Sequence, residues 1–327
     1  MKDAILLFIF GLILLIKGGD WFVDGATGLA KRFRIPEILI GATVVSIGTT
    51  LPEVMVSATA AASGSGDMAY GNAIGSIICN TALIAAITVA IKPANVDKKS
   101  LIIPVCFFFG AAIFYSCMAY FAGEFPRWAG ILLLITFVVY MAITVTKALS
   151  SKNKSAEVLD PNAEKEEEES GSLIKDLIFL VLGAAIIAVG ADLLVDKGTY
   201  IAKEWGVPET VISLTFVALG TSLPELVTAI TSLIKGRGAL SLGNLIGANL
   251  FNLVLVSGMA ITISPFTVPS GLMIGNISAS LIVDIPVMLT AMALLTVPAI
   301  IRGKLAKAQG FILLAIYAAF ITLQFIL

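Results

Sequence analysis

Ten long apolar segments are the feature that most limits how this chain can fold. A membrane-spanning helix needs about 20 consecutive apolar residues, and each segment has roughly that length. The segments lie at 4–28, 37–62, 69–92, 101–122, 127–148, 173–196, 208–234, 240–264, 281–301 and 306–327. Only 13% of the 327 residues are charged and the mean hydropathy is +1.00, which leaves too little polar surface for a soluble domain of this size. We therefore predict an all-α integral membrane protein with ten transmembrane helices.

The scarce residue types exclude several classes of function. The chain has no histidine, which removes histidine-based catalysis and most zinc or haem sites. The three cysteines, Cys79, Cys106 and Cys117, lie inside apolar segments and indicate neither a disulfide framework nor a zinc site. The net charge of −1 gives no support for a nucleic-acid partner. We expect membrane lipid around the helices, no cofactor and no obligate protein partner.

Lysine and arginine are distributed unevenly between the two ends of the predicted helices. If the N-terminus defines one side, the loops on the opposite side carry 16 of these residues and the loops on the N-terminal side carry four. Positively charged loops favour the cytoplasm. We therefore predict that both termini lie outside the cell.

The sequence contains an internal duplication. Residues 18–80 align without a gap onto 190–252, and 25 of the 63 positions are identical, whereas unrelated helices of this composition would agree at about a tenth of positions. Most identical residues are polar, glycine or proline, including the pairs Pro52/Pro224, Glu53/Glu225, Asn72/Asn244 and Asn80/Asn252. Five helices separate the copies, so the second copy is inserted upside down. Inverted repeats of this kind are typical of transporters, with the ion site near the middle of the membrane.

The duplication divides the chain into three parts. We predict a first five-helix repeat over 1–149 with its motif at 41–80, and a second five-helix repeat over 173–327 with its motif at 213–252. The stretch 150–172 between them contains four consecutive glutamates. It is predicted to be a solvated, mostly disordered cytoplasmic linker, with a weak Ca2+ sensor as the alternative.

Two matching motifs place a glutamate inside a predicted span. The second span contains the motif GATVVSIGTTLPE, which ends at Glu53. The seventh span contains the motif SLTFVALGTSLPE, which ends at Glu225. A carboxylate inside a membrane costs at least a few kcal/mol, so it indicates a functional site by default. The proline before each glutamate has no N–H and releases the carbonyl four residues earlier, at Gly48 or Gly220. Further oxygens come from the neighbouring residues Thr49, Thr50, Thr221 and Ser222.

The third and eighth spans carry a second pair of motifs. These read GNAIGSIICN, ending at Asn80, and GNLIGANLFN, ending at Asn252. Gly75 and Gly247 are predicted to let their helices approach neighbouring helices closely. The amides of Asn80 and Asn252 can then join the two glutamates. A site built only from oxygen suits hard cations such as Ca2+ and Na+.

The paired motifs resemble the two alpha repeats of the Na+/Ca2+ exchanger family, within the Ca2+/cation antiporter superfamily, and the likeness covers most of the chain. The resemblance implies Ca2+ and Na+ as transported ions, a ten-helix fold and a prokaryotic plasma membrane. The ligands it implies are the side chains of Glu53 and Glu225, the residues Thr49, Thr50, Thr221, Ser222 and Ser76, the backbone at Ser46 and Ala218, and the amides of Asn80 and Asn252.

Three positions depart from the family pattern. Ala248 stands where the pattern usually has serine, and Ile77 replaces the asparagine that usually follows Gly-Ser. Asn252 occupies a position where some relatives, notably those that also move K+, have aspartate. A neutral amide at that position argues against K+ dependence.

The predicted function is antiport of Ca2+ against Na+ by alternating access at a mid-membrane site. The alternative is antiport of Ca2+ or another divalent cation against H+, with Glu53 and Glu225 as the proton carriers. A membrane-embedded enzyme is a distant alternative because the sequence offers no nucleophile–base pair, and the protein is therefore expected not to be an enzyme.

The remaining aspartates of the spans are predicted to have structural roles. Asp20, Asp24, Asp192 and Asp196, near opposite ends of the first and sixth helices, are expected to pair with lysines close in sequence, namely Lys17, Lys31 or Lys197. Attraction of cations toward each mouth of the protein is the alternative. Asp284 is expected to cap the ninth helix, in front of Pro286.

Overall fold

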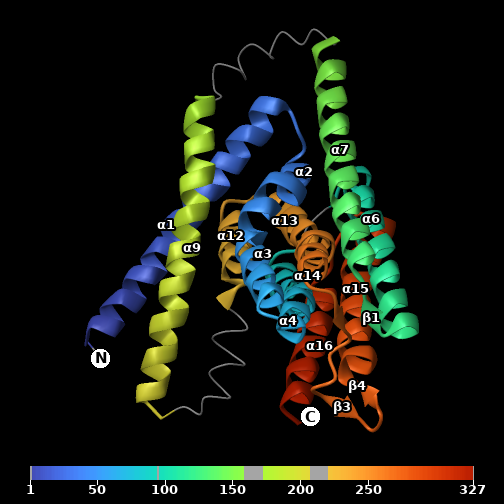
Figure 1. Ribbon diagram of the computed structural model, residues 1–327. Coiled ribbons are helices and arrows are strands. Elements are labelled where there is room, and N and C mark those ends of the chain that lie inside the picture. Colours follow the sequence, from blue (N-terminus) through green and yellow to red (C-terminus); the bar gives the residue numbers. More distant parts are fainter. Residues whose placement is uncertain (1, 94–95, 158–171, 207–219, 327) are drawn as a thin grey trace.

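The chain forms a bundle of long helices (Figure 1). The computed structural model describes residues 2–93, 96–157, 172–206 and 220–326. Within this part of the chain, nine helical stretches are long and apolar enough to cross a membrane, and Leu223–Ile234 is a shorter apolar helix. The prediction of an all-helical membrane protein is confirmed, and the ten helices of two inverted repeats are consistent with this fold.

The first half of the chain forms five spans, most of which contain a π-helical segment (η). They are α1 (Lys2–Phe33); α2 (Glu37–Ile40), η1 (Gly41–Val45) and α3 (Ser46–Ala62); α4 (Gly66–Ile78), η2 (Cys79–Ala85) and α5 (Ala86–Ile91); α6 (Lys98–Cys117) and η3 (Met118–Ala122); and α7 (Arg127–Glu157). Because α7 continues to Glu157, the first part of the stretch predicted to be a disordered linker is helical. Most of the rest of that stretch lies outside the described residues.

The second half repeats this pattern of spans. Its helices are α9 (Leu173–Glu204); α12 (Leu223–Ile234); α13 (Gly238–Phe251), η5 (Asn252–Val256) and α14 (Ser257–Ile263); η6 (Ser280–Asp284) and α15 (Ile285–Arg302); and α16 (Lys307–Ile326). The first part of the predicted span 208–234 lies outside the described residues. Two short antiparallel ribbons join β1 (Glu124–Phe125) to β2 (Phe266–Thr267) and β3 (Met273–Ile274) to β4 (Ile277–Ser278).

The two ends of the bundle can be named from the chain. We call the end where α7 stops and α9 starts the linker end, and the end where α1 starts and α16 stops the termini end (Figure 1). α12 runs toward the linker end, because Lys235, the residue after it, contacts α1 there. α13 then runs back from the linker end toward the middle of the bundle.

α1 and α9, which are repeat-related helices, lie side by side at one flank of the bundle (Figure 1). Glycines bring their backbones into contact. A Cβ atom on Gly18 would lie 2.9 Å from the backbone nitrogen of Ile187, and a Cβ on Gly190 would lie 2.9 Å from that of Leu15. The 172-residue shift relates Gly18 to Gly190, so the two repeats meet here through equivalent surfaces.

The centre of the bundle is built around α13. Every residue from Leu240 to Phe251 is buried, so this helix is surrounded by protein on all sides. A Cβ on Gly247 would lie 2.3 Å from the Ser46 hydroxyl, which confirms the close approach predicted for that glycine. For Gly75 no described atom lies within 4 Å of such a Cβ, so the described residues do not show the close approach predicted there.

Candidate cation site

The two predicted glutamates are buried in the middle of the bundle. Glu53 lies on α3 and Glu225 lies in the first turn of α12, and both are fully buried. The two helices are in contact, and the two carboxylates are close enough to interact electrostatically. All four carboxylate oxygens lack a hydrogen-bond partner among the described residues. Because an unpartnered buried carboxylate is strongly destabilising, these oxygens are suited to binding a cation.

The two predicted asparagines show the same property. Asn80 and Asn252 are fully buried, and neither the nitrogen nor the oxygen of either amide has a partner in the described part of the chain. Asn80 lies in η2 and Asn252 begins η5, so both repeats place their asparagine in a π-helical segment. Such segments occur frequently at functional sites.

Hydroxyl groups complete the predicted set of oxygen ligands. The hydroxyls of Thr50 and Ser222 are buried and have no partner among the described residues. Ser76 is also buried, while Thr221 is half-buried in the turn that precedes α12. Ala218, whose backbone was a predicted ligand, lies outside the described residues.

Thr49 and Ser46 use their hydroxyls inside the protein. The Thr49 hydroxyl donates to the amide oxygen of Asn244 over 3.2 Å. The Ser46 hydroxyl lies 2.9 Å from the backbone oxygen of Asn244 and 2.7 Å from that of Gly41. These contacts join α3 of the first repeat to α13 of the second, and the Thr49 side chain also lies beside Glu225. Both residues therefore hold the two repeats together at the site.

Asn72 and Asn244 support the site but were not predicted to belong to it. The Asn72 amide donates to the backbone oxygen of Glu53 over 3.2 Å and to the Ser57 hydroxyl over 2.8 Å. It thereby ties α4 to the helix that carries Glu53. The signal was present in the sequence, because Asn72 and Asn244 are an identical polar pair of the duplication.

The backbone differs between the two glutamate motifs. Pro52 lies inside α3, as predicted. Pro224 instead lies in the first turn of α12, directly after a turn at Thr221 and Ser222. A proline in a first turn removes no helical hydrogen bond. In the described residues Gly220 is helical, a turn follows at Thr221 and Ser222, and α12 begins at Leu223.

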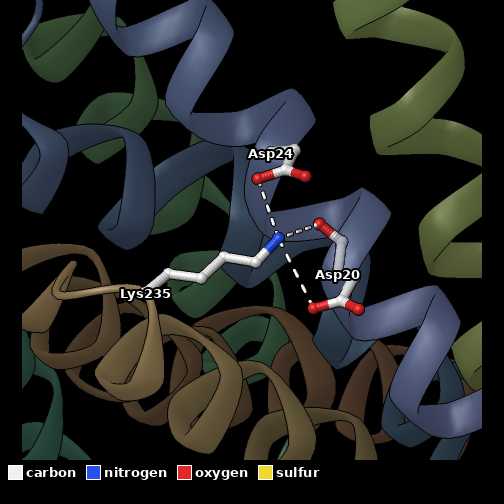
Figure 2. A network of polar contacts seen from close by, with 3 residues as sticks. All are labelled: Asp20, Asp24 and Lys235. Atoms are coloured by element: carbon white, nitrogen blue, oxygen red, sulfur yellow. Dashed lines mark hydrogen bonds and ion pairs between the residues drawn. The ribbon is translucent and has the colours of Figure 1, made fainter.

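Ion pairs between helices gather at the linker end. Lys235 lies 2.8 Å from Asp24 Oδ1 and 3.5 Å from Asp20 Oδ1, and it donates to the backbone oxygen of Asp20 over 2.8 Å (Figure 2). Arg237 lies 2.6 Å from Glu37. These contacts tie the loop between α12 and α13 to α1 and α2.

Two of the predictions for the aspartates were wrong. Asp20 and Asp24 pair with Lys235, far away in sequence, and not with Lys17 or Lys31, because the end of α12 packs against α1. Asp284 makes no side-chain capping bond: it has helical backbone angles, since η6 continues directly into α15, and it accepts a hydrogen bond from Gln324 over 2.9 Å. The predicted pair of Asp196 with Lys197 is confirmed, at 2.5 Å.

A helical membrane bundle whose two repeats surround a pair of buried carboxylates defines a multi-pass ion transporter. The family model described as "Sodium/calcium exchanger protein" matches residues 3–146 and 175–326. The chain therefore belongs to the sodium/calcium exchanger family, as its motifs predicted.

Individual relatives agree with this assignment. The chain is 29% identical to the sodium/calcium exchanger MaX1 of Methanosarcina acetivorans, with 98% of each chain covered. It is 34% identical to an uncharacterised membrane protein of Methanocaldococcus jannaschii, with coverage of 95% of this chain and 94% of the relative. The fold matches a solved structure of the sodium-calcium exchanger NCX_Mj soaked with 2.5 mM Na+ and 10 mM Sr2+, with a TM-score of 0.79, 32% identity and 98% of both chains covered.

Proposed function

We propose that this protein exchanges Ca2+ for Na+ across a prokaryotic plasma membrane, at the site formed by Glu53 and Glu225. The observation that carries the proposal is the set of buried oxygens without protein partners: two carboxylates, the amides of Asn80 and Asn252, and the hydroxyls of Thr50 and Ser222. Among the described residues no three acidic, cysteine or histidine side chains gather. The remaining ligands are therefore neutral oxygens, which suit a hard cation that must later leave.

The charge of the pair is consistent with exchange. Two ionised carboxylates neutralise one Ca2+, or most of the charge of a few Na+ ions, so the same site can hold either ion in turn. Each bound ion removes the electrostatic repulsion between the glutamates, which is large in a site shielded from water. Occupation by Ca2+ or by Na+ is therefore favoured over an empty site, and this is the condition that coupled exchange requires.

The test is 45Ca2+ flux in proteoliposomes. Purified protein is reconstituted, and Ca2+ movement is measured with an imposed Na+ gradient, an imposed pH gradient, or neither. We expect flux that follows the Na+ gradient. Ca2+ flux that follows the pH gradient in the absence of Na+ would instead establish the Ca2+/H+ alternative. Ca2+ flux that needs neither a Na+ gradient nor a pH gradient would indicate a channel.

We further propose an orientation in which the linker end faces the cytoplasm and both termini lie outside. The 16 lysine and arginine residues in loops at the linker end, against four at the termini end, support this orientation. We also keep the division into repeats at 1–149 and 173–327 with the cytoplasmic linker 150–172 between them, and lipid as the surroundings of the bundle.

A further inference from the structure

Three buried hydroxyls lie between the glutamate pair and the linker end. Thr228 and Ser232 lie on α12, and Ser241 lies on α13. Their exposed fractions are 0%, 0% and 3%. None of the three hydroxyl oxygens has a hydrogen-bond partner in the part of the chain that the structure describes. We call these residues the hydroxyl track.

The hydroxyl track continues the face of α12 that carries Glu225. Thr228 and Ser232 follow Glu225 by three and seven residues, a spacing that places all three side chains on one face of an α-helix. At 1.5 Å per residue, Ser232 lies about 10 Å along the helix from Glu225, in the direction of the linker end. The site and the track therefore form one polar stripe along α12.

α13 presents a matching stripe. Ser241 precedes Asn252 by eleven residues, which is about three helical turns, so the two positions share a face. α12 and α13 pack against each other. The Asn244 amide nitrogen, one turn from Ser241, also lacks a partner among the described residues.

Other helices of this protein contain both kinds of hydroxyl: those of Thr27, Thr50 and Thr199 also lack a partner among the described residues, whereas many others bond within their own helix. Thr81, Thr144 and Thr296 each donate to the carbonyl four residues earlier, over 2.8, 2.8 and 2.6 Å. A buried hydroxyl without any partner destabilises a fold, and Thr228 and Ser232 do not use the helix carbonyls as these three residues do. Their hydroxyls are thus available to another partner, such as water or a cation.

The duplication shows that helix packing does not require these hydroxyls. The positions of the first repeat that correspond to the track are Val56, Ala60 and Ala69, all apolar. The first repeat does contain two buried hydroxyls nearby: Ser57, to which Asn72 donates, and Tyr70, whose hydroxyl has no partner among the described residues. In the described part of the chain, the row of unpartnered hydroxyls along the glutamate helix belongs to the second repeat, on the side of the site that leads to the linker end.

We propose that the hydroxyl track is the route along which partly hydrated Ca2+ and Na+ pass between the glutamate pair and the linker end. This inference rests on the proposed function. Neutral hydroxyl oxygens replace part of the hydration shell of a hard cation without holding it as firmly as carboxylates do. Lys235 and Arg237 lie between Ser232 and Ser241 in the sequence. Lys235 forms an ion pair with α1 (Figure 2), and Arg237 forms one with α2, at the linker end of the proposed route.

The first test compares substitutions that remove a hydroxyl with one that keeps it. With 45Ca2+ presented at the linker face of oriented vesicles, at low Ca2+ and with saturating counter-ion on the other side, Thr228→Val and Ser232→Ala should each lower the flux roughly tenfold. Thr228→Ser, which retains the hydroxyl, should stay within about twofold of the parent protein. Presented at the termini face, Ca2+ must leave along the same track, so its flux in Thr228→Val and Ser232→Ala should also fall, while Thr228→Ser should again stay within about twofold of the parent.

Thr231→Val provides the matched control on α12. Its hydroxyl faces α1, since a Cβ on Gly19 would lie 2.8 Å from it, and its flux should equal that of the parent from both faces. Equal losses in Thr228→Val and Thr231→Val, or no loss in Thr228→Val and Ser232→Ala, would overturn the route.

The second test does not depend on transport. Ser232→Cys should react with a membrane-impermeant, positively charged methanethiosulfonate from the linker face and not from the termini face. Thr231→Cys and the parent, with its three native cysteines, give the background. Absence of reaction at position 232 from the linker face, or reaction from the termini face, contradicts the route. Failure of the proposed function would show itself differently, as absence of Na+-driven Ca2+ flux in the parent with the labelling unchanged.

Discussion

In the proposed site, each glutamate would supply one of the two negative charges that balance a divalent cation. Glu53→Gln or Glu225→Gln leaves the other carboxylate with only neutral oxygens around the ion. Loss of one partner of a buried charged group costs about 3–5 kcal/mol, so Ca2+ transport should fall at least about 100-fold. The measurement is 45Ca2+ uptake into proteoliposomes driven by a Na+ gradient.

Glu124→Gln is the control for that experiment. Glu124 is exposed in β1 at the termini end, and its substitution should leave uptake unchanged. All three variants should elute as monodisperse protein after purification. Near-normal uptake in either Glu53→Gln or Glu225→Gln would refute the assignment of the site.

Ser76 and Ala248 test whether Na+ is the counter-ion. The two positions are related by the duplication and both are buried, but only Ser76 offers a hydroxyl. Extra ligands flanking the glutamates matter more for several Na+ ions than for one Ca2+. We expect Ser76→Ala to raise, and Ala248→Ser to lower, the Na+ concentration needed for half-maximal Ca2+ efflux, by a factor of roughly 3–10. Unchanged values in both variants would argue against Na+ coupling.

Single residues show what the sequence could and could not predict about the site. The sequence singled out Glu53, Glu225 and the two asparagines because a duplicated polar residue in an apolar span has few explanations other than function, and all four are buried without side-chain partners among the described residues. The roles of Thr49 and Ser46 were not predictable, because their hydroxyls turn toward Asn244 of the other repeat. The partner of each hydroxyl depends on how closely α3 and α13 approach each other, and the local sequence pattern does not indicate that distance.

Lys235 connects two elements that are far apart in the sequence. Its contacts with Asp20 and Asp24 are partly exposed, so their contribution to stability is small. In a double-mutant cycle of Lys235→Met and Asp24→Asn, we expect a coupling free energy of about 0.5–1 kcal/mol that decreases in high salt. Unfolding in detergent is the measurement, and a coupling near zero at low salt would contradict the contact.

The packing of α1 against α9 depends on the absence of side chains at the contact. A Cβ on Gly183 would lie 2.5 Å from the backbone nitrogen of Phe22, so Gly183→Ala must push the helices apart. We expect it to lower the free energy of unfolding by about 1–3 kcal/mol. Gly110→Ala on α6, where no described atom lies within 4 Å of the added Cβ, should not destabilise the protein. Equal thermal stability of the two variants would show that the contact is not tight.

The elements were predicted more completely than their internal geometry. Apolar length located the spans, since a buried segment of about 20 residues must be helical in lipid. The π-helical segments that hold Asn80 and Asn252 were missed. An added residue rotates the rest of a helix by about 100°, but these spans are apolar on most faces, so the rotation leaves no signal in the sequence. The turn at Thr221 and Ser222, directly before α12, was not predicted, since identical motifs suggested identical backbones.

The orientation of the whole molecule can be tested with single cysteines. Asp67→Cys, in the first turn of α4 at the termini end, should react with an impermeant thiol reagent added outside intact cells. Lys99→Cys, in the first turn of α6 at the linker end, should react only after the cells are opened. The parent with its native cysteines gives the background in both cases. The reverse pattern would invert the proposed orientation.

The division of the two glutamates between the repeats also has a consequence for the ancestry of the protein. Each repeat brings one carboxylate to the centre of the bundle, and the two repeats are inserted in opposite directions. A single ancestral five-helix chain could have formed a neutral Ca2+ site only by pairing with a second copy inserted the other way. Such an ancestor must have entered the membrane in both orientations. Fusion of two copies would remove that requirement and let each half change separately, and the halves do differ where Thr228, Ser232 and Ser241 correspond to Val56, Ala60 and Ala69.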